Sequence, residues 1–223
     1  VTNREYRAFM DAGGYRNRDY WKHRFVSDGR ELTWDDAMKA FVDRSGQPGP
    51  STWLGGDYPE GQADYPVSGV SWYEAEAYAE YAGMSLPTSA HWDVARGSET
   101  PMVKYPQSGG FALLAPFSNF GSRGPVRVGS LPNVTAYGAY DMPGNVREWC
   151  WNEAPAGRML RGGAWDDNTY EFASWRQAPA MDRSYKNGFR LAVYPQATKD
   201  SDAAFGPLTL AAVTSFLGDL FWT

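Results

Sequence analysis

The side chains best suited to chemistry are concentrated between residues 165 and 185. Asp166 and Asp167 are adjacent carboxylates, which could act together as a general acid and base. Aromatic, amide and cationic side chains surround them: Trp165, Asn168, Tyr170, Trp175, Arg176, Arg183 and Tyr185. Groups of these kinds position a polar ligand when they line a cleft. Adjacent carboxylates are also common in turns. The alternative is therefore a structural loop, with the tryptophans in the core and the arginines in ion pairs.

Thiol and imidazole groups are scarce in this sequence. Cys150 is the one cysteine, so no disulfide can form within the chain. We expect it to be a small buried core residue, as free cysteines usually are. His23 and His91 are the two histidines and lie far apart. His91 stands three residues after Thr88 at a predicted helix start, where we expect it either to pack and cap the helix or to line a pocket.

The composition excludes several classes of partner. Basic residues number 21 and acidic residues 26, which gives a net charge of −5. A nucleic-acid-binding face needs clustered lysine and arginine, so we expect no nucleic acid partner. No apolar run approaches the ~18 residues that span a bilayer, so we expect no membrane partner. The sequence carries no targeting signal and opens at a helix start. We interpret it as a fragment of a longer protein, whose compartment, cytoplasmic or periplasmic, stays open.

The helices and strands that position these residues are predicted from helix-capping residues and from the glycines and prolines that end them. Thr2 with Glu5, and Ser71 with Glu74, form capping boxes. Helices are expected over 2–13, 33–46 and 71–82, with a short one after Thr88. The 24 glycines, 15 prolines and many aromatic residues are typical of a loop-rich fold, in which rings pack under irregular backbone.

Short strands are expected at 66–70, 138–142, 158–163 and 189–193. Helices first and strands later indicate an α+β fold with a small twisted antiparallel sheet and two to four helices. Residues 196–223 change in character and form a C-terminal extension. They are either an amphipathic helix that docks on the domain or a linker to a further domain.

Five sequence blocks occur in order over residues 1–195: Pro66-Val-Ser-Gly-Val-Ser-Trp, Leu86-Pro-Thr-Ser-Ala-His-Trp, Asp141-Met-Pro-Gly-Asn-Val-Arg-Glu-Trp, Arg161-Gly-Gly-Ala-Trp and Asn187-Gly-Phe-Arg-Leu. Together they resemble the sulfatase-modifying-factor, or formylglycine-generating-enzyme, domain family. The resemblance implies a C-type-lectin-like fold for residues 1–195. It is closest to a bacterial subgroup in which this domain is fused to kinase or hydrolase domains.

The resemblance also shows what this chain lacks. Formylglycine-generating enzymes carry two active-site cysteines after the Arg-Gly-Gly block, and paired thiolates suit copper. The matching positions here are Asp167 and Phe172, which supply no thiolate, so copper is not expected. Cys150 falls where the family often has a scaffold cysteine. A related sulfoxide synthase uses three histidines to hold iron, and His23 and His91 alone cannot form that site.

A calcium site is the metal site that the resemblance implies. Its ligands would be the carboxylates of Asp141 and Glu148 and the carbonyls of Gly144 and Val146. Hard oxygen ligands of this kind suit Ca²⁺. In the alternative, the two carboxylates cap backbone amides and pair with Arg147 or Arg161. A second family site would involve Asn119 and Phe120, but the acidic residue expected downstream is absent.

Three functions fit these observations. The preferred hypothesis is a non-catalytic, calcium-stabilised binding module that contacts other domains of the same polypeptide, a peptide or a small polar ligand. The ligand cleft would lie after the Arg-Gly-Gly block, where members of the family hold their peptide. The second hypothesis is a divergent oxidoreductase that uses Asp167 and its neighbours. The third is a variable ligand-display protein, although such proteins usually end at the Gly-Phe-Arg block.

Overall fold

The computed structural model describes residues 1–97 and 114–194. Helices in these residues are α1 (Asn3–Asp11), α2 (Trp34–Ala40), α3 (Trp72–Ala82) and α4 (Ser89–Ala95), with shorter 3-10 turns η1 (Arg18–Tyr20), η3 (Ala115–Phe117) and η4 (Thr169–Phe172). Strands are β1 (Phe25–Ser27), β2 (Arg30–Leu32), β3 (Arg147–Ala154), β4 (Gly157–Arg161), β5 (Arg176–Ala178) and β6 (Asn187–Gly188). The predicted extension at 196–223 lies outside the described residues.

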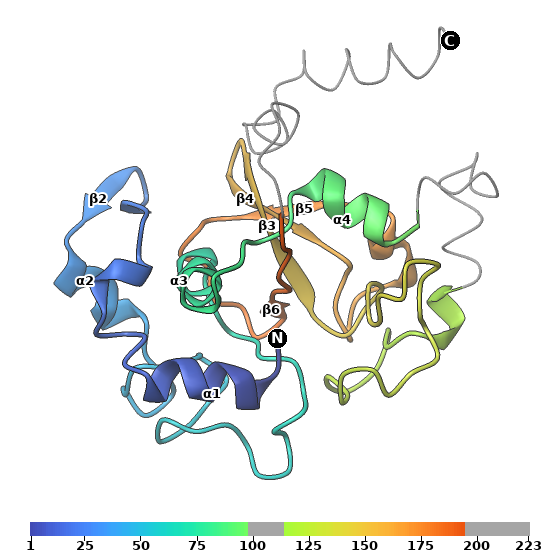
Figure 1. The fold of residues 1–223 in the computed structure, drawn as a ribbon, viewed down its shortest axis with the longest axis horizontal. Coiled ribbons are helices and arrows are strands. Elements are labelled where there is room, and N and C mark those ends of the chain that lie inside the picture. Colours follow the sequence, from blue (N-terminus) through green and yellow to red (C-terminus); the bar gives the residue numbers. More distant parts are fainter. Residues whose placement is uncertain (98–113, 195–223) are drawn as a thin grey trace, which may run out of the picture.

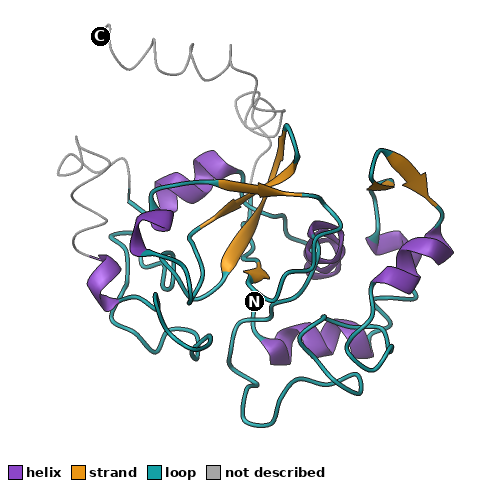
Figure 2. Cartoon of the chain, turned by 180° about the vertical axis from the view of Figure 1, so that it is seen from behind, coloured by secondary structure: helices purple, strands orange, loops and turns teal. Residues whose placement is uncertain are grey.

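A four-stranded sheet with the order β5-β4-β3-β6 forms the centre of the fold (Figure 1). The β3–β4 and β4–β5 pairs are antiparallel, and β6 adds a short parallel pairing to β3. The helices α3 and α4 flank this sheet, and the separate β1–β2 hairpin lies beyond α3 (Figures 1 and 2). The predicted α+β class, with a small antiparallel sheet and four helices, is confirmed.

Both predicted capping boxes begin the helices that carry the core. Thr2 and Glu5 exchange hydrogen bonds at the start of α1, and Ser71 and Glu74 do so at the start of α3. The buried rings of the two helices then meet, since Tyr6 of α1 stacks on Tyr78 of α3 with centroids 5.5 Å apart. Such aromatic pairs contribute stability beyond the apolar area that they bury.

The strand predictions were less accurate than the helix predictions. Residues 138–142 are not a strand, because Asp141 has a φ of 53° and the backbone there forms turns. The longest strand, β3, was not predicted. Its residues Glu148–Cys150 are buried in succession, so the alternation that marks a half-buried strand is missing. Segment 66–70 forms only an isolated bridge from Pro66 to Thr2, and α2 ends at residue 40 rather than 46.

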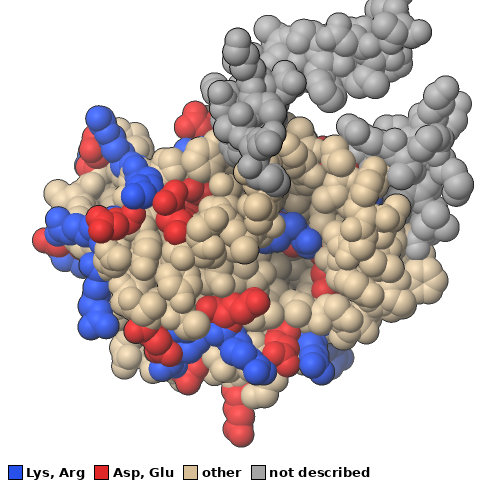
Figure 3. Space-filling view, in the orientation of Figure 1, with Lys and Arg blue, Asp and Glu red and all other residues tan. Residues whose placement is uncertain are grey.

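The interior is divided into two clusters. The larger one joins α1, α3 and the aromatic loops to the sheet, and the smaller one contains Trp92, Met142, Cys150, Met159 and Phe172. Acidic and basic side chains are interspersed on the face shown in Figure 3. Among the described helices, none combines the length and the apolar character that a bilayer crossing requires.

Candidate functional site

Two glycines at the end of β4 turn the chain into the predicted site. Gly162 and Gly163 have φ values of 95° and 76°. A Cβ atom on Gly163 would lie 2.8 Å from the ring of Phe120, and one on Gly162 would lie 2.9 Å from the carbonyl oxygen of Met142. Larger residues are therefore excluded at both positions. The chain leaves β4 through these two glycines, and the segment that follows then lies against the start of β3, where Asp167 meets Arg147.

Asp167 is held by Arg147, which lies at the start of β3. The two side chains form a bidentate pair at 2.9 and 2.6 Å, and their side chains are 8% and 13% exposed. Asp167 also accepts a hydrogen bond from the backbone N–H of Ala164 at 2.9 Å. Because its oxygens are already engaged, Asp167 is a structural carboxylate in this arrangement.

Asp166 is the more accessible of the two predicted carboxylates. Its Oδ2 atom lies 2.7 Å from Nζ of Lys186 and accepts a hydrogen bond from the Tyr185 hydroxyl at 3.3 Å. Partial burial opposes the charge of Lys186, but the hydrogen bond and charge of Asp166 outweigh that effect and raise the pKa of Lys186. Trp165 packs on Tyr185 with ring centroids 5.8 Å apart. We call Trp165, Asp166, Tyr185 and Lys186 the Trp165 surface.

Four further predicted cleft residues, Asn168, Tyr170, Trp175 and Arg176, are exposed. Tyr170 and Trp175 are 58% and 49% exposed. Arg176 pairs with Glu171 at 2.5 Å, an interaction that raises the pKa of Arg176. Asn168 lies beside Tyr170, to whose hydroxyl its amide donates at 3.3 Å.

Arg183 does not join the predicted cleft. Its guanidinium forms a bidentate pair with the fully buried Glu74, at 2.8 and 3.0 Å, and donates to the carbonyls of Ala40, Val42 and Gly49. An arginine has five N–H donors. Here their hydrogen bonds connect α3 to the end of α2 and to the segment that follows it. Arg183 is therefore a structural residue, as the alternative interpretation of the sequence proposed.

The predicted calcium turn contains three residues with positive φ, namely Asp141, Gly144 and Asn145. At Gly144 a Cβ atom would lie 2.4 Å from the carbonyl oxygen of Asn119. The turn is therefore packed directly on residue 119, the start of the second predicted calcium site. Phe120 packs beside the smaller core cluster, and the Asn119 amide donates to Gly124 and Asn145.

The two carboxylates of the turn have different partners. Glu148 accepts hydrogen bonds from Trp92 at 2.6 Å and from Arg190 at 2.6 and 2.7 Å. Asp141 accepts one from the backbone N–H of Gly129 through Oδ2, whereas its Oδ1 atom is buried with no hydrogen-bond partner among the described residues. The alternative interpretation is confirmed where Asp141 caps a backbone amide, but its pairing with Arg147 or Arg161 is wrong, because Arg147 pairs with Asp167 and Arg161 with Asp93.

These residues fit a hard cation in part. The unpartnered oxygen of Asp141 is a ligand of the kind that Ca²⁺ prefers, and the turn also brings backbone carbonyls. Glu148 is already held by a guanidinium, but a carboxylate has about four lone-pair sites, so it retains capacity for a further partner. The calcium site stays a prediction.

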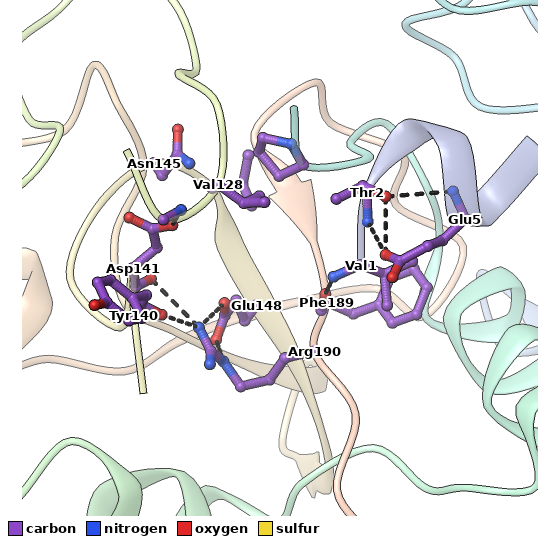
Figure 4. A pocket seen from close by; sticks show the side chains of 13 residues that line it. Val1, Thr2, Glu5, Val128, Tyr140, Asp141, Asn145, Glu148, Phe189 and Arg190 are labelled. Carbon is purple, nitrogen blue, oxygen red and sulfur yellow. Dashed lines mark hydrogen bonds and ion pairs between the residues drawn. The ribbon is translucent and has the colours of Figure 1, made fainter. Parts of the chain in front are cut away.

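A cavity of about 360 Å³ lies beside the turn, and Asp141, Glu148 and Arg190 line it (Figure 4). Figure 4 shows the guanidinium of Arg190 between the Glu148 carboxylate and the carbonyls of Tyr140 and Asp141. Burial opposes the charge of Arg190, but Glu148 outweighs that effect and raises the pKa of Arg190.

Histidine and cysteine side chains lie outside both regions. The Nδ1 atom of His91 lies 2.6 Å from the Thr88 hydroxyl at the start of α4, which agrees with a local capping role. Cys150 is buried in the smaller core cluster, and burial raises the pKa of its thiol. His23 packs between Trp72 and Trp151. Within residues 1–97 and 114–194, no group of three or more histidine, cysteine, aspartate and glutamate side chains converges as a metal site would require.

Comparison with known proteins decides the family. Residues 1–195 match the sulfatase-modifying factor enzyme 1-like domain. The chain belongs to this family. The formylglycine-generating enzyme of Thermomonospora curvata is 30% identical over 263 residues, which cover 95% of this chain and 79% of that enzyme. The family resemblance of the sequence blocks is confirmed.

Two further relatives are larger proteins. Serine/threonine-protein kinase pkn1 of Chlamydia pneumoniae is 35% identical over 156 residues, covering 59% of this chain and 24% of the kinase. Hercynine oxygenase of Mycolicibacterium thermoresistibile is 35% identical over 162 residues, covering 67% of this chain and 33% of the oxygenase. This chain of the sulfatase-modifying factor family therefore spans about a quarter to a third of these relatives.

The solved structure of CarF has a similar fold. It matches with a TM-score of 0.53 and 22% identity, and the match covers 86% of this chain and 82% of CarF. At this level of identity the likeness concerns the fold alone. The predicted C-type-lectin-like fold is confirmed.

Sequence reasoning missed Arg147 and Lys186 as members of the site. Each is the charged partner of a residue that was predicted, Asp167 and Asp166 respectively. Arg147 and Asp167 are 20 residues apart and lie on different elements, so no local spacing signals their pairing.

Proposed function

We propose that this domain is a non-catalytic binding module of a larger bacterial protein. It would present the Trp165 surface to another domain of the same polypeptide, a peptide or a small polar ligand. The Arg147–Asp167 pair carries this proposal, because it occupies the place where the family resemblance puts a catalytic cysteine. Phe172, at the second cysteine position, is 2% exposed and packs on Trp92.

These two residues are chemically unsuited to copper. A soft thiolate pair is replaced by a carboxylate neutralised by Arg147 and by an apolar ring in the core. The exposed aromatic rings nearby, Tyr170, Trp175 and Tyr185, are instead suited to contact a partner. Tyrosine, tryptophan and arginine are enriched at the residues that dominate protein interfaces.

We further propose that Ca²⁺ binds at the turn 141–148 and stabilises the module. Asp141 would supply its buried Oδ1 atom, Gly144 and Val146 their carbonyls, and Glu148 a remaining lone pair. A bound cation would remove the cost of an unpartnered carboxylate oxygen, about 1–3 kcal/mol for a buried polar group. The ion would contribute structure and no step of a reaction.

Metal analysis of the purified protein tests both parts. We expect calcium near one per chain by mass spectrometry, and a melting temperature that falls when a chelator is added. At a free calcium concentration 100-fold above Kd, the stabilisation lost would be about 2.7 kcal/mol. The variant Asp141→Asn should lose most of this response, whereas the exposed-site control Asp57→Asn should keep it.

Two results would contradict the proposal separately. A melting temperature that changes with neither calcium nor chelator would contradict the calcium site, while the proposed binding module would still stand. Stoichiometric copper or iron together with oxygen consumption would overturn the non-catalytic assignment itself.

The similarity to hercynine oxygenase favours one alternative, a divergent oxidoreductase. In that case Asp167 would have to leave Arg147 and act on a substrate. Turnover of any substrate should then be abolished in Asp167→Ala, and full activity of that variant would rule out this role.

A further inference from the structure

A histidine and a buried carboxylate meet on the side of α3 that faces the β1–β2 hairpin. His23 lies between η1 and β1, and its Nε2 atom is 3.6 Å from Oε2 of Glu76 on α3. The two groups come from segments 53 residues apart, so their contact joins the 21–32 segment to the helix. This region belongs neither to the turn 141–148 nor to the Trp165 surface.

The surroundings of the pair are aromatic. The imidazole ring of His23 packs edge-on against Trp72, with centroids 4.8 Å apart, and against Trp151, with centroids 5.3 Å apart. The His23 side chain is 30% exposed and that of Glu76 is 6% exposed. The pair is therefore enclosed on the protein side and reachable by solvent protons on the other.

Glu76 is poorly satisfied for a buried carboxylate. Its Oε1 atom is buried and has no hydrogen-bond partner among the described residues. A buried carboxylate without compensating hydrogen bonds is costly when ionised. That cost falls if the carboxylate takes up a proton, which it can share with the neighbouring imidazole nitrogen.

The other charged groups near Glu76 do not remove this need. Arg158 of β4 stacks on Trp72 at 3.7 Å and pairs with Glu153 of β3. Glu80 lies one helical turn further along α3 and is exposed. Burial raises the pKa of Glu76, with His23 opposing the rise and Glu80 adding to it.

We propose that His23 and Glu76 form a pH-sensitive latch, in which a proton held by the pair fastens residues 21–32 to α3. Loss of that proton as the pH rises leaves an ionised, buried carboxylate beside the imidazole and loosens the segment. The direction follows from linkage. A carboxyl group whose pKa is raised by folding stabilises the folded form at low pH, and the stabilisation is lost as the pH rises through the folded pKa.

Hydrogen exchange measured by mass spectrometry tests the latch in the intact chain. After correction for intrinsic rates, we expect opening of residues 21–32 to increase by roughly tenfold from pH 5 to pH 8. The segment around α1 serves as an internal reference. Its protection should not follow the same pH dependence.

Three variants separate the latch from general effects of pH. Glu76→Gln keeps the shape but cannot titrate, so it should abolish the pH dependence of opening. His23→Gln removes the imidazole that opposes the raised pKa of Glu76, so it should move the pH-dependent loss of protection to higher pH. Glu80→Gln changes an exposed carboxylate on the same helix and should retain it. Unchanged pH dependence in both Glu76→Gln and His23→Gln, or a wild-type segment that opens equally at pH 5 and pH 8, would overturn the latch. If Glu76→Gln does not fold, the pH dependence of hydrogen exchange in His23→Gln tests the latch by itself.

Discussion

Asp167 shows how the partners of a carboxylate limit the chemistry that it can perform. Its carboxylate is bound by the guanidinium of Arg147 and by the amide of Ala164, and little of it reaches solvent. A residue held in this way fixes the loop after β4. The loop in turn carries Trp165, which packs on Tyr185.

Breaking the Arg147–Asp167 pair should destabilise the domain. We expect Asp167→Ala or Arg147→Ala to reduce the free energy of unfolding by about 3–5 kcal/mol, because each leaves a buried charge unpaired. The double variant should lose less than the sum of the two single variants. Urea unfolding of the four proteins gives the coupling energy. Additive losses would show that the two side chains do not interact in solution.

Among the elements, the loop after α2 is organised by a single carboxylate. Asp43 is 5% exposed and accepts hydrogen bonds from the amides of Ser45, Gln47 and Gly56 and from the Ser45 hydroxyl. Burial opposes its charge, but these hydrogen bonds outweigh that effect and lower the pKa of Asp43. The stabilisation is therefore present above the unfolded pKa and is lost as the pH falls through the folded one.

Replacing Asp43 should remove part of the acid sensitivity of the domain. We expect Asp43→Asn to reduce the free energy of unfolding at pH 7 by about 1.5–3 kcal/mol, the range for hydrogen bonds to a charged group. The difference from wild type should shrink as the pH falls below about 4, the ordinary pKa of aspartate in the unfolded chain, and on through the lower folded pKa. Denaturant unfolding at pH 3 to 7 measures it, with the exposed Asp57→Asn as control. A constant difference across this range would contradict the assignment.

The elements also show what could be predicted from sequence. The helix starts at Thr2, Ser71 and Thr88 were found because capping is local and side-chain types report it. The strand β3 was missed because burial on both faces removes the alternation that the prediction relied on. The candidate site residues Asp166, Asp167 and Tyr185 do come together. Their partners could not be predicted, since the pairing of Arg147 with Asp167 is fixed by tertiary structure.

For the whole molecule, the two core clusters meet at the sheet, and Cys150 lies in the smaller one. Its thiol is fully buried and burial raises its pKa, so neither access nor ionisation favours reaction in the folded state. Reaction of this thiol therefore requires the molecule to open.

Cys150 should report on global unfolding. At pH 8 we expect its reaction with a thiol reagent to be slower than in urea by roughly 10³- to 10⁴-fold, as a stability of about 5 kcal/mol implies. A second thiol introduced by Ser130→Cys, at an exposed position, should react at once and serves as the control. Rapid reaction of wild-type Cys150 would show that the smaller cluster opens without the rest of the domain.

The contacts of residues 183–190 determine when this fold can form during synthesis. Arg183 neutralises Glu74, which was made 109 residues earlier, and the carbonyl of Asn187 accepts the amide of Gly69. On a ribosome, α3 therefore leaves the exit tunnel long before the guanidinium that its buried carboxylate needs. A nascent chain paused near residue 150 exposes the unfinished aromatic core, and such exposed surface is what chaperones bind.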